Sequence, residues 1–451
     1  MRLRRGKKKR RACVVGLDGV PIGLLKRLAE GSVMPRTAGI IGGGGLRQMR
    51  AALPPVSSVS WSSFMTGANP GAHGIFGFTD VNAESYQLEF PMFPDLAAPT
   101  LWDRLGERGR RCAVINQPAT YPAREMAGAL VSGFVALSLE RSVWPRGHLR
   151  ALEGMGYRAD VDAKGAQEDP DGLLDQLEST LEAHRRAARY FWEQEEWDYF
   201  ELVVTGTDRL HHFLWRAVEE ADDPRHERAM AYYRAVDAVV GEVWDRFHAG
   251  GSGDREGEGF LLLSDHGFAG VERDVRLNAW LAESGYLEYA REKPESVGDI
   301  GPRTRAFALD PGRIYLNVKG RFARGCVEPE EAPALRAELA ARLCELAEGG
   351  ETVITRVFAR EEIYEGARAH LGPDLVALSK PGYDLKGTTK EQCSKEQCSK
   401  EQCSKGRKVF GETRFQGMHT WEDAFVWTLL PIPAEPEISD LAGAIIAWVA
   451  G

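Results

Sequence analysis

The sequence contains no long hydrophobic run. A helix that crosses a bilayer needs about 18 or more consecutive apolar residues, and no apolar run in the 451 residues approaches that length. The basic segment MRLRRGKKKRR is followed only by the short run ACVVGL, which ends at Asp18, so it lacks the apolar core of a signal peptide. We therefore expect a cytoplasmic protein without a membrane span.

The chain also has fewer basic than acidic residues, so its formal net charge is −9. Proteins that bind nucleic acid need a basic surface for the phosphates, so nucleic acid is not expected as the main partner. The basic residues gather in residues 1–11, which we interpret as a disordered solubilising arm. A contact of this arm with nucleic acid or an anionic membrane is the alternative.

Cysteine is scarce, with seven residues in the chain. We expect Cys13, Cys112, Cys326 and Cys344 to act as small core residues. The other three lie in the tandem repeat KEQCSKEQCSKEQCS. A step of five residues turns a helix by about 140°, and the repeat lacks the close Cys pairs of zinc knuckles. It therefore predicts a low-complexity loop at 388–406 rather than a metal site.

Short apolar runs alternate with amphipathic segments along the chain. The runs that we predict as buried strands are 12–17, 112–117, 128–134, 199–206, 260–265 and 424–430. The segments that we predict as helices are 171–194, 226–247 and 332–347. Strands without polar alternation, separated by helices, favour a mostly parallel sheet that is covered on both faces. We therefore predict an α/β fold, a three-layer αβα sandwich over residues 12–450, with a smaller α+β insertion at 270–375.

Acidic side chains directly follow three of the predicted strands. Asp18 follows ACVVGL, Asp208 follows YFELVVTG, and Asp265 with His266 follows FLLLS. In open α/β sheets, ligands bind beyond the carboxyl ends of the strands, so these side chains are expected at one edge. Carboxylates that are buried together require a neutralising cation. This pattern favours a metal site.

Two further histidines extend the set. In VVTGTDRLHHFLW, His212 stands one helical turn after Asp208, so both side chains share one helix face. His419, in GMHTWEDAF, precedes the last apolar strand. Aspartate and histidine without thiolate suit zinc, manganese or iron. We predict two divalent metal ions, with Zn²⁺ as the first choice and Mn²⁺ as the alternative.

A run of small residues contains the candidate nucleophile. In PPVSSVSWSSFMTG, a Pro-Pro loop passes into a helical stretch with five serines between Ser57 and Ser63. A helix N-terminus favours an anion through its free N–H groups and its dipole. A plain helix cap explains Ser57 equally well, and spacing alone does not choose among the five serines.

Five segments resemble, in order, the motifs of the alkaline phosphatase superfamily. They are GLDGV, PPVSSVSWSSFMTG with PGAHGI, TDRLHHF, LLLSDHGF and GMHTWEDA. Within it the chain is most similar to the type I phosphodiesterase/nucleotide pyrophosphatase branch. The segments YDLKG and GRIYLNVKGR resemble its bacterial group of predicted phosphohydrolases and phosphomutases. The resemblance spans about residues 12 to 431.

The resemblance implies a role for each matching position. The implied metal ligands are Asp208, His212 and His419 for one ion, and Asp18, Asp265 and His266 for the other. Ser57 matches the nucleophile, and His211 is then a neighbour of the ligand that points elsewhere. Ser60 stands where this branch has an asparagine that holds a phosphoryl oxygen, and its shorter side chain weakens the expectation of a nucleotide substrate.

The expected activity is that of a two-metal phosphohydrolase. It would cleave phosphodiester or phosphoanhydride bonds of a small-molecule phosphate ester through a phosphoseryl intermediate. No arginine or lysine motif matches a third phosphoryl oxygen, which favours diesters. The alternatives are a phosphomonoesterase or phosphomutase of the same superfamily, and a non-catalytic metal-containing binding protein. Sulfatases are disfavoured, because SSVSW lacks the proline and arginine of their nucleophile motif.

Overall fold

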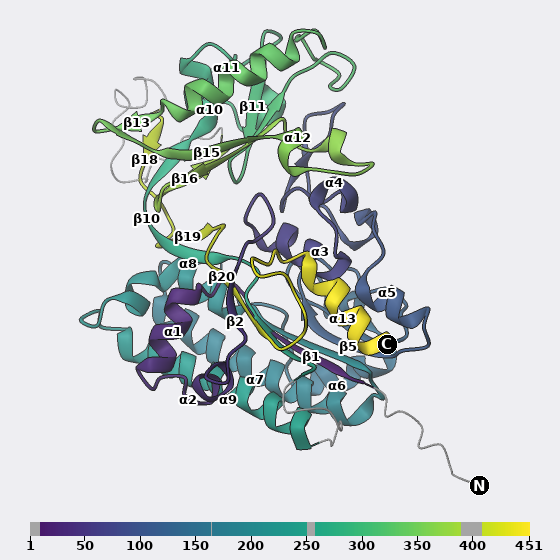
Figure 1. Ribbon diagram of the computed structural model, residues 1–451. Helices are drawn as coiled ribbons and strands as arrows, with labels where there is room; N and C mark the ends of the chain where they lie inside the picture. The colour runs from purple at the N-terminus through teal and green to yellow at the C-terminus, as the bar shows by residue number, and fades with distance from the viewer. Residues whose placement is uncertain (1–9, 164, 250–257, 389–407) are drawn as a thin grey trace. The chain divides into compact units, whose positions relative to one another are not determined.

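The computed structural model describes residues 10–163, 165–249, 258–388 and 408–451 (Figure 1). The chain divides into two compact units. The first comprises Met1–Ile75, Met92–Ala269 and His419–Gly451, and the second comprises Phe76–Pro91 and Gly270–Met418. The predicted insertion of residues 270–375 falls in the second unit. Apart from residues 10, 11 and 388, the predicted basic arm and the predicted loop 388–406 lie outside the described residues.

The first unit is built on an eight-stranded sheet with the order β2-β20-β9-β1-β8-β5-β6-β7. Its strands are β1 (Ala12–Leu17), β2 (Leu46–Met49), β5 (Cys112–Gln117), β6 (Gly128–Ser132), β7 (Val143–Trp144), β8 (Tyr199–Val204), β9 (Phe260–Leu263) and β20 (Ala424–Thr428). Strands β9, β1, β8, β5 and β6 are parallel, and β2, β20 and β7 pair antiparallel at the edges. The predicted α/β class with a mostly parallel sheet is confirmed.

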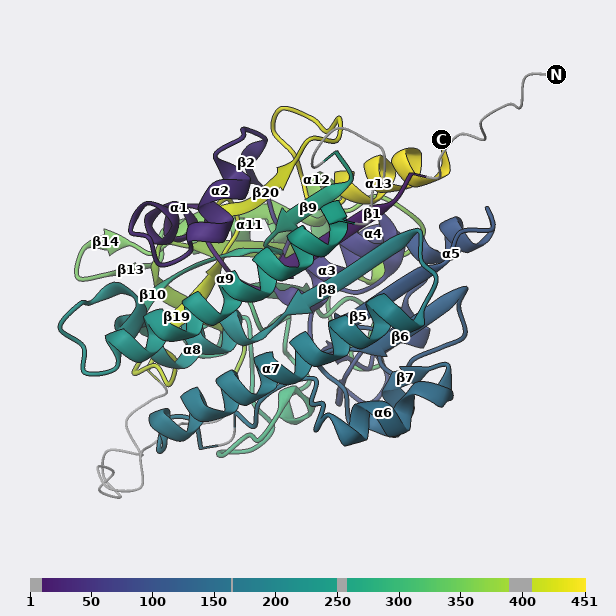
Figure 2. The ribbon, with the colours of Figure 1, turned by 90° about the horizontal axis from the view of Figure 1, so that it is seen from below.

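Helices cover both faces of this sheet. One face packs against α1 (Ile22–Glu30), α2 (Pro35–Ile41), α7 (Pro170–Gln194), α8 (Gly206–Glu219) and α9 (His226–Ala249). The other packs against α3 (Ser57–Thr66), α5 (Leu101–Gly106) and α13 (Asp440–Ala450). Figure 2 shows α7 and α9 lying over the sheet, with their axes running along about the same direction as β8. The fold is the predicted three-layer sandwich.

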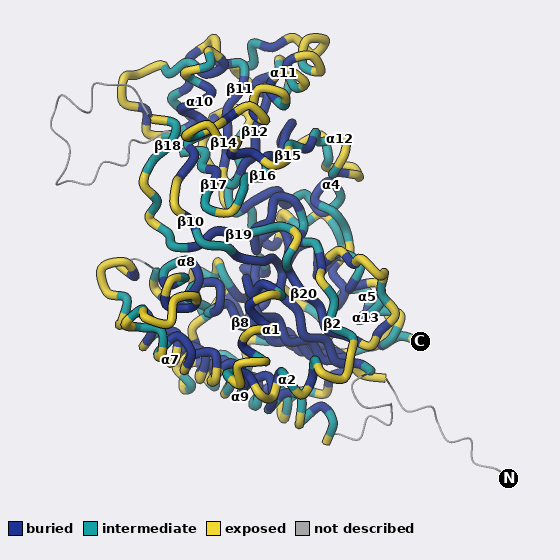
Figure 3. The backbone as a smooth tube through the Cα atoms, turned by 60° about the vertical axis from the view of Figure 1, so that its left-hand side comes forward, coloured by how far each residue is buried: buried dark blue, intermediate teal, exposed yellow. Residues whose placement is uncertain are grey.

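The central strands of the sheet are mainly apolar because both of their faces are covered. In β1, Val15 belongs to the core on the α7 and α9 face, and Val14 belongs to the core on the α3 and α13 face. The central strands accordingly appear buried along their whole length in Figure 3. This explains why continuous apolar runs, rather than alternating ones, mark the strands in the sequence.

Helix α7 shows how local sequence sets the helix boundaries. The Asp169 side chain accepts a hydrogen bond from the Gly172 N–H, and Pro170 occupies the first helical position, where its missing N–H costs nothing. Leu173, Leu177 and Leu181 recur one turn apart and are buried. The helix therefore presents a continuous apolar stripe to the sheet.

The second unit contains an antiparallel sheet with the order β11-β12-β16-β15. Its strands are β11 (Ala306–Leu309), β12 (Arg313–Leu316), β15 (Ile354–Ala359) and β16 (Leu375–Ser379). Its helices are α10 (Leu277–Glu283), α11 (Ala332–Cys344) and α12 (Arg360–Ile363). Other strands nearby in sequence are β10 (Gly267–Arg276), β17 (Gly382–Lys386), β18 (Phe410–Gly411) and β19 (Gly417–Thr420).

The four isolated cysteines differ in their burial. Cys13 and Cys112 are buried, as predicted, and Cys326 is partly buried. Cys344 is exposed, so its prediction as a core residue was wrong. In α11 the buried residues include Leu339 and Leu343. Cys344 follows Leu343 by one residue, and the helical turn of about 100° per residue moves it off the buried face.

Among the described helices, none combines the length and the apolar character that a bilayer crossing needs.

Candidate active site

Strand register brings the predicted carboxylates to one edge of the sheet. Gly16 of β1 pairs with Leu263 of β9 in parallel register. Asp18 and Asp265 therefore each lie two residues beyond this pair, at the carboxyl ends of the two strands. On the other side of β1, Leu17 pairs with Val204 of β8, and Asp208 follows in the first turn of α8. All belong to the first unit.

Asp208, His212 and His419 form the first group of side chains. Asp208 Oδ1 lies 3.4 Å from His212 Nε2 and 3.2 Å from His419 Nε2. The two Nε2 atoms are 2.9 Å apart. His419 Nδ1 lies 3.1 Å from the Pro55 carbonyl oxygen, which suits a ring that donates from Nδ1 and keeps the Nε2 lone pair for a ligand.

Asp18, His266 and Ser57 form the second group. The Ser57 hydroxyl lies 3.2 Å from Asp18 Oδ1 and 3.1 Å from His266 Nε2. All three side chains are buried. Val56 occupies the cap position and Ser57 is the first residue of α3, so the hydroxyl is placed at the positive end of the helix dipole. Ser57 therefore does not occupy the N-cap position, which the alternative interpretation of the sequence assigned to it.

Asp265 lies behind this second group. Its Oδ1 accepts a hydrogen bond from the Gly19 N–H at 3.1 Å, and its Oδ2 lies 3.3 Å from His266 Nε2. Two groups of three side chains could each hold a metal ion, because the ligand atoms within each group lie within 4.8 Å of one another. The groups are Asp208, His212 and His419, and Asp18, Asp208 and His266. Asp208 belongs to both sets, whereas the resemblance implies Asp265 in its place in the second.

The donor atoms fit divalent cations. Asp208 Oδ1 and Asp265 Oδ2 are buried and have no hydrogen-bond partner among the described residues. Such orphaned carboxylate oxygens are costly unless a cation faces them. The nitrogen and oxygen donors are those that zinc and manganese accept.

Burial and neighbouring carboxylates raise the pKa values of two carboxyl groups in the cluster, those of Asp18 and Asp265. Burial raises the pKa of Asp18 well above its usual range, and the charges on Asp265 and Asp208 add to this effect. Burial also raises the pKa of Asp265 to about 8. A divalent cation would reverse these shifts, because it favours the ionised carboxylates.

Asp208 behaves differently because two histidine rings and an arginine side chain lie beside it. Burial acts to raise its pKa, but His212, His419 and Arg209 outweigh burial and hold the pKa well below its usual range. The His266 ring has a pKa well below its usual range, chiefly because it is buried. A neutral imidazole is the form that ligates metals.

Two residues that the sequence singled out, His211 and Ser60, adjoin cluster residues in the helices α8 and α3, and a further histidine, His73, contacts α3. His211 Nδ1 lies 2.9 Å from the Gly19 carbonyl oxygen and its Nε2 contacts the Tyr233 hydroxyl, so it points away from His212. His73 Nε2 lies 3.0 Å from the Ser63 hydroxyl. Ser60 is fully buried, and its hydroxyl has no hydrogen-bond partner within the described part of the chain.

Sequence reasoning missed two side chains that support the cluster. Trp61, one turn after Ser57, donates from Nε1 to Asp18 Oδ2 at 3.0 Å. Arg209, the residue after Asp208, places Nη1 3.6 Å from Asp208 Oδ2. The helical spacing of Trp61 from Ser57 was a usable signal, whereas nothing in the sequence reveals the direction of the Arg209 side chain.

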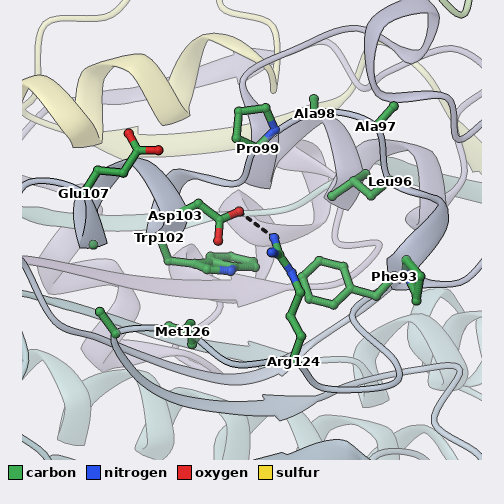
Figure 4. Close-up of a pocket in the computed structure, with 13 residues that line it drawn as sticks. Phe93, Leu96, Ala97, Ala98, Pro99, Trp102, Asp103, Glu107, Arg124 and Met126 are labelled. Carbon is green, nitrogen blue, oxygen red and sulfur yellow. Dashed lines mark hydrogen bonds and ion pairs between the residues drawn. The ribbon is translucent and has the colours of Figure 1, made fainter.

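A separate cavity of about 760 Å³ lies around α5 and shares no residue with the cluster. Figure 4 shows two of its three charged side chains, Asp103 and Arg124, joined in an ion pair beneath the loop of residues 96–99, with Glu107 apart from them. Arg124 also lies over the Phe93 ring. Because the lining holds only this ion pair and the Glu107 carboxylate, with no histidine, serine or cysteine, the cavity lacks the convergent reactive groups of an active site.

Comparisons with known proteins agree with this geometry. The model of the type I phosphodiesterase/nucleotide pyrophosphatase family matches residues 12–422. The structure of phosphonoacetate hydrolase from Sinorhizobium meliloti 1021, in complex with phosphonoacetate, is similar with a TM-score of 0.62 and 17% identity, covering 98% of this chain and 96% of that chain. Comparison with curated protein sequences found no match.

Murine ectonucleotide pyrophosphatase/phosphodiesterase 5 is similar with a TM-score of 0.53 and 12% identity, covering 98% of this chain and 95% of that one. Its inactive form in complex with AMP is similar with a TM-score of 0.52 and 13% identity, at the same coverage of 98% and 95%. At these identities the likeness concerns the fold, whereas the family match extends over nearly the whole sequence. The chain therefore belongs to the type I phosphodiesterase/nucleotide pyrophosphatase family, a family of phosphoester hydrolases within the alkaline phosphatase superfamily.

Proposed function

We propose that this protein cleaves phosphodiester or phosphoanhydride bonds of a small-molecule substrate through a phosphoseryl intermediate at Ser57. The observation that carries the proposal is the position of the Ser57 hydroxyl. It lies at the N-terminus of α3, within hydrogen-bond distance of both Asp18 and His266. A nucleophile oriented by a neighbouring acceptor is the recurring arrangement of covalent catalysis.

Two divalent ions, Zn²⁺ or Mn²⁺, are the proposed cofactors. The proposed ligands are Asp208, His212 and His419 for one ion, and Asp18, Asp265 and His266 for the other, with Asp208 near both. When bound, such ions lower the pKa of a serine hydroxyl and stabilise the charge that develops on the phosphoryl and leaving oxygens.

The protein's own residues orient the reacting atoms. Asp18 and His266 fix the direction of the Ser57 hydroxyl, and Trp61 fixes Asp18 in turn. The Ser57 oxygen forms a bond to phosphorus as the bond to the leaving oxygen breaks. Water then cleaves the bond between Ser57 and phosphorus and restores the hydroxyl.

The ligands of the structural relatives support a small phosphorus-containing anion as the substrate. The bacterial relative was solved with phosphonoacetate and the murine relative with AMP. Both are compact molecules that carry one phosphorus group. We propose a small phosphate ester for this chain, with Ser60, on the same helix as Ser57, as a substrate-binding residue.

Turnover of chromogenic esters tests the proposal. Zinc-loaded and manganese-loaded protein is assayed with bis(4-nitrophenyl) phosphate and with 4-nitrophenyl phosphate, and Ser57→Ala is the diagnostic variant. Ser58→Ala is the matched control, because Ser58 is the neighbouring buried serine and its hydroxyl has no hydrogen-bond partner among the described residues.

We expect diester turnover that Ser57→Ala abolishes and Ser58→Ala retains. Trapping of the 4-nitrophenyl phosphoryl group on Ser57, which remains after one 4-nitrophenolate leaves the diester, would establish the intermediate when detected by mass spectrometry after an acid quench. Turnover of the monoester alone would replace the diesterase assignment with that of a phosphatase or mutase. Metal binding without turnover of either ester would favour a non-catalytic binding protein.

A further inference from the structure

A cavity of about 450 Å³ lies in the first unit, lined by residues 134–139, 142 and 157–162. This volume is within the range of about 300–1,000 Å³ that is typical of ligand pockets. Residues 134–139 follow β6, so they lie beyond the carboxyl end of a parallel strand. The cavity is therefore built at the edge of the sheet where α/β proteins bind ligands, as the metal cluster is.

Arg209 connects this cavity to the metal cluster. Its Nε and Nη2 donate to Asp160 Oδ2 at 2.8 and 2.7 Å, and its guanidinium lies 4.1 Å from the Phe134 ring centre. Asp160 and Phe134 both line the cavity. The remaining Nη1 lies 3.6 Å from Asp208 Oδ2. Arg209 therefore contacts a residue of the cluster with one end of its guanidinium and two residues of the cavity lining with the other.

The walls of the cavity are largely apolar. Its lining includes Phe134, Val135, Leu137 and Leu139. Val135 is 42% exposed and Leu137 is 69% exposed, so both present a large apolar side chain to the solvent. Covering such surface is favourable by about 25 cal/mol for each Å² removed from water. An apolar group that enters the cavity gains this stabilisation.

The charges around the cavity leave no surplus of positive charge. The lining contains Arg158, Asp160 and Asp162. With Arg209, which Asp160 binds, there are two charges of each sign. An anionic group would enter a largely apolar cavity in which Arg158 and Arg209 are already balanced in number by Asp160 and Asp162, so its loss of hydration is poorly compensated. An uncharged group avoids this cost.

We propose that this cavity binds the organic group of the phosphate ester, and that it selects an uncharged, largely apolar group over an anionic one. The inference rests on the proposed function, because it takes the phosphoryl group to bind at the metal cluster. It narrows the substrate class to esters whose organic part carries no negative charge near the phosphorus.

Phosphonates with a single organic group are suitable probes, because only one part of each molecule can enter the cavity. Methylphosphonate, phenylphosphonate and 4-carboxyphenylphosphonate are titrated into the zinc-loaded full-length protein by calorimetry. We expect phenylphosphonate to bind about tenfold or more tightly than methylphosphonate, because its ring buries apolar surface. The carboxylate of the third probe is expected to remove this gain.

A variant at the exposed rim tests where the organic group binds. Leu137→Arg adds a cation to the cavity and, because Leu137 is 69% exposed, leaves the core intact. We expect it to tighten binding of 4-carboxyphenylphosphonate about tenfold and to leave methylphosphonate unchanged. Leu429→Arg is the matched control, because Leu429 is 44% exposed, belongs to the first unit and does not line the cavity. Thermal unfolding checks that both variants fold.

Three results of these binding experiments would overturn the inference. Equal affinity for methylphosphonate and phenylphosphonate, or no binding of either, would show that the cavity does not hold the organic group. An equal effect of both arginine variants would show that the response is one of overall charge. The proposed function is judged separately, by ester turnover and its loss in Ser57→Ala. A protein without turnover that still prefers phenylphosphonate, and responds to Leu137→Arg alone, would keep the cavity assignment and lose the hydrolase assignment.

Discussion

Asp18 and Asp265 lie at the same level of two neighbouring parallel strands, because Gly16 of β1 pairs with Leu263 of β9. Both carboxyl groups are buried, with exposures of 2% and 0%. Their separation is therefore set by the hydrogen-bonded register of the sheet rather than by a flexible loop. A site on rigid strands is preorganised for a metal ion, and each part of this arrangement has measurable consequences.

Asp208 is expected to matter for both of the proposed metal ions, because it belongs to both sets of possible ligand atoms. Asp208→Ala should lower the bound metal from two ions per chain to none, whereas His212→Ala and His266→Ala should each remove one ion. Metal content is measured by mass spectrometry after dialysis against low zinc. His226→Ala is the control outside the cluster. Retention of one ion by Asp208→Ala would restrict Asp208 to a single site.

Gly16 makes room for the tryptophan that holds Asp18. A Cβ added at Gly16 would lie 2.4 Å from Trp61 Cη2 and 3.3 Å from Val203 Cγ2. Gly16→Ala should therefore destabilise the protein by about 1–3 kcal/mol, the usual cost of overpacking. It should also displace Trp61 from Asp18.

Urea unfolding measures the change in stability. The matched control is Gly23→Ala in α1, where the nearest atom, Arg27 Nη1, is 4.0 Å from the added Cβ. That variant should stabilise the helix by about 0.5–1 kcal/mol. If Gly16→Ala unfolds at the same urea concentration as the wild type, Trp61 has more freedom than its packing indicates.

Much of the fold could be predicted from the sequence because its physical signals are local. Each strand of the parallel core is composed mainly of apolar residues, and α7 begins at a capping aspartate followed by proline. The edge strand β7 was missed, because two residues, Val143 and Trp144, cannot display a periodicity. The burial of Cys344 was misjudged by one position on its helix.

The candidate site was predictable only where residues follow strands directly. Asp18 and Asp265 do so, and the parallel register then brings them together. Ser57 could not be chosen among its neighbouring serines without a family resemblance, since the choice depends on how α3 meets the sheet. Arg209 reaches Asp160 across 49 residues of sequence, and such a tertiary contact leaves no local pattern.

Arg209 is expected to orient Asp208 for metal binding. Groups that hold a ligand in place typically contribute about 10–100-fold to metal affinity. Arg209→Met should therefore weaken zinc binding by about that factor, measured by competition with a chromophoric chelator. The control is Arg110→Met, because Arg110 pairs with Asp198 at 3.3 Å just before β8 begins, and its side chain is similarly buried.

Both arginine variants leave a carboxylate without its partner, so both should lose stability. Only Arg209→Met should change the affinity for zinc. If the two variants bind zinc equally well, the contact between Arg209 and Asp208 is structural rather than a determinant of metal binding.

Glu201 is expected to make the stability of the protein depend on pH. It is fully buried in β8, where the Tyr199 hydroxyl donates to Oε2 at 2.6 Å, and burial raises the pKa of its carboxyl group from 4.5 to about 8. Between pH 4.5 and about pH 8, the carboxyl group of Glu201 keeps its proton in the folded state and has lost it in the unfolded state. Stability should therefore fall as the pH rises, by up to about 1.4 kcal/mol per pH unit, and level off above pH 8.

Glu201→Gln isolates this effect, because it keeps the shape of the protonated side chain and cannot ionise. Urea unfolding of the wild type and the variant between pH 5 and pH 9 should give curves that diverge with increasing pH, with the variant the more stable at the alkaline end. Glu30→Gln, at an exposed position of α1, controls for the loss of one carboxylate. Parallel curves for the wild type and Glu201→Gln would mean that Glu201 is already ionised in the folded protein at low pH, stabilised by more than the hydroxyl of Tyr199.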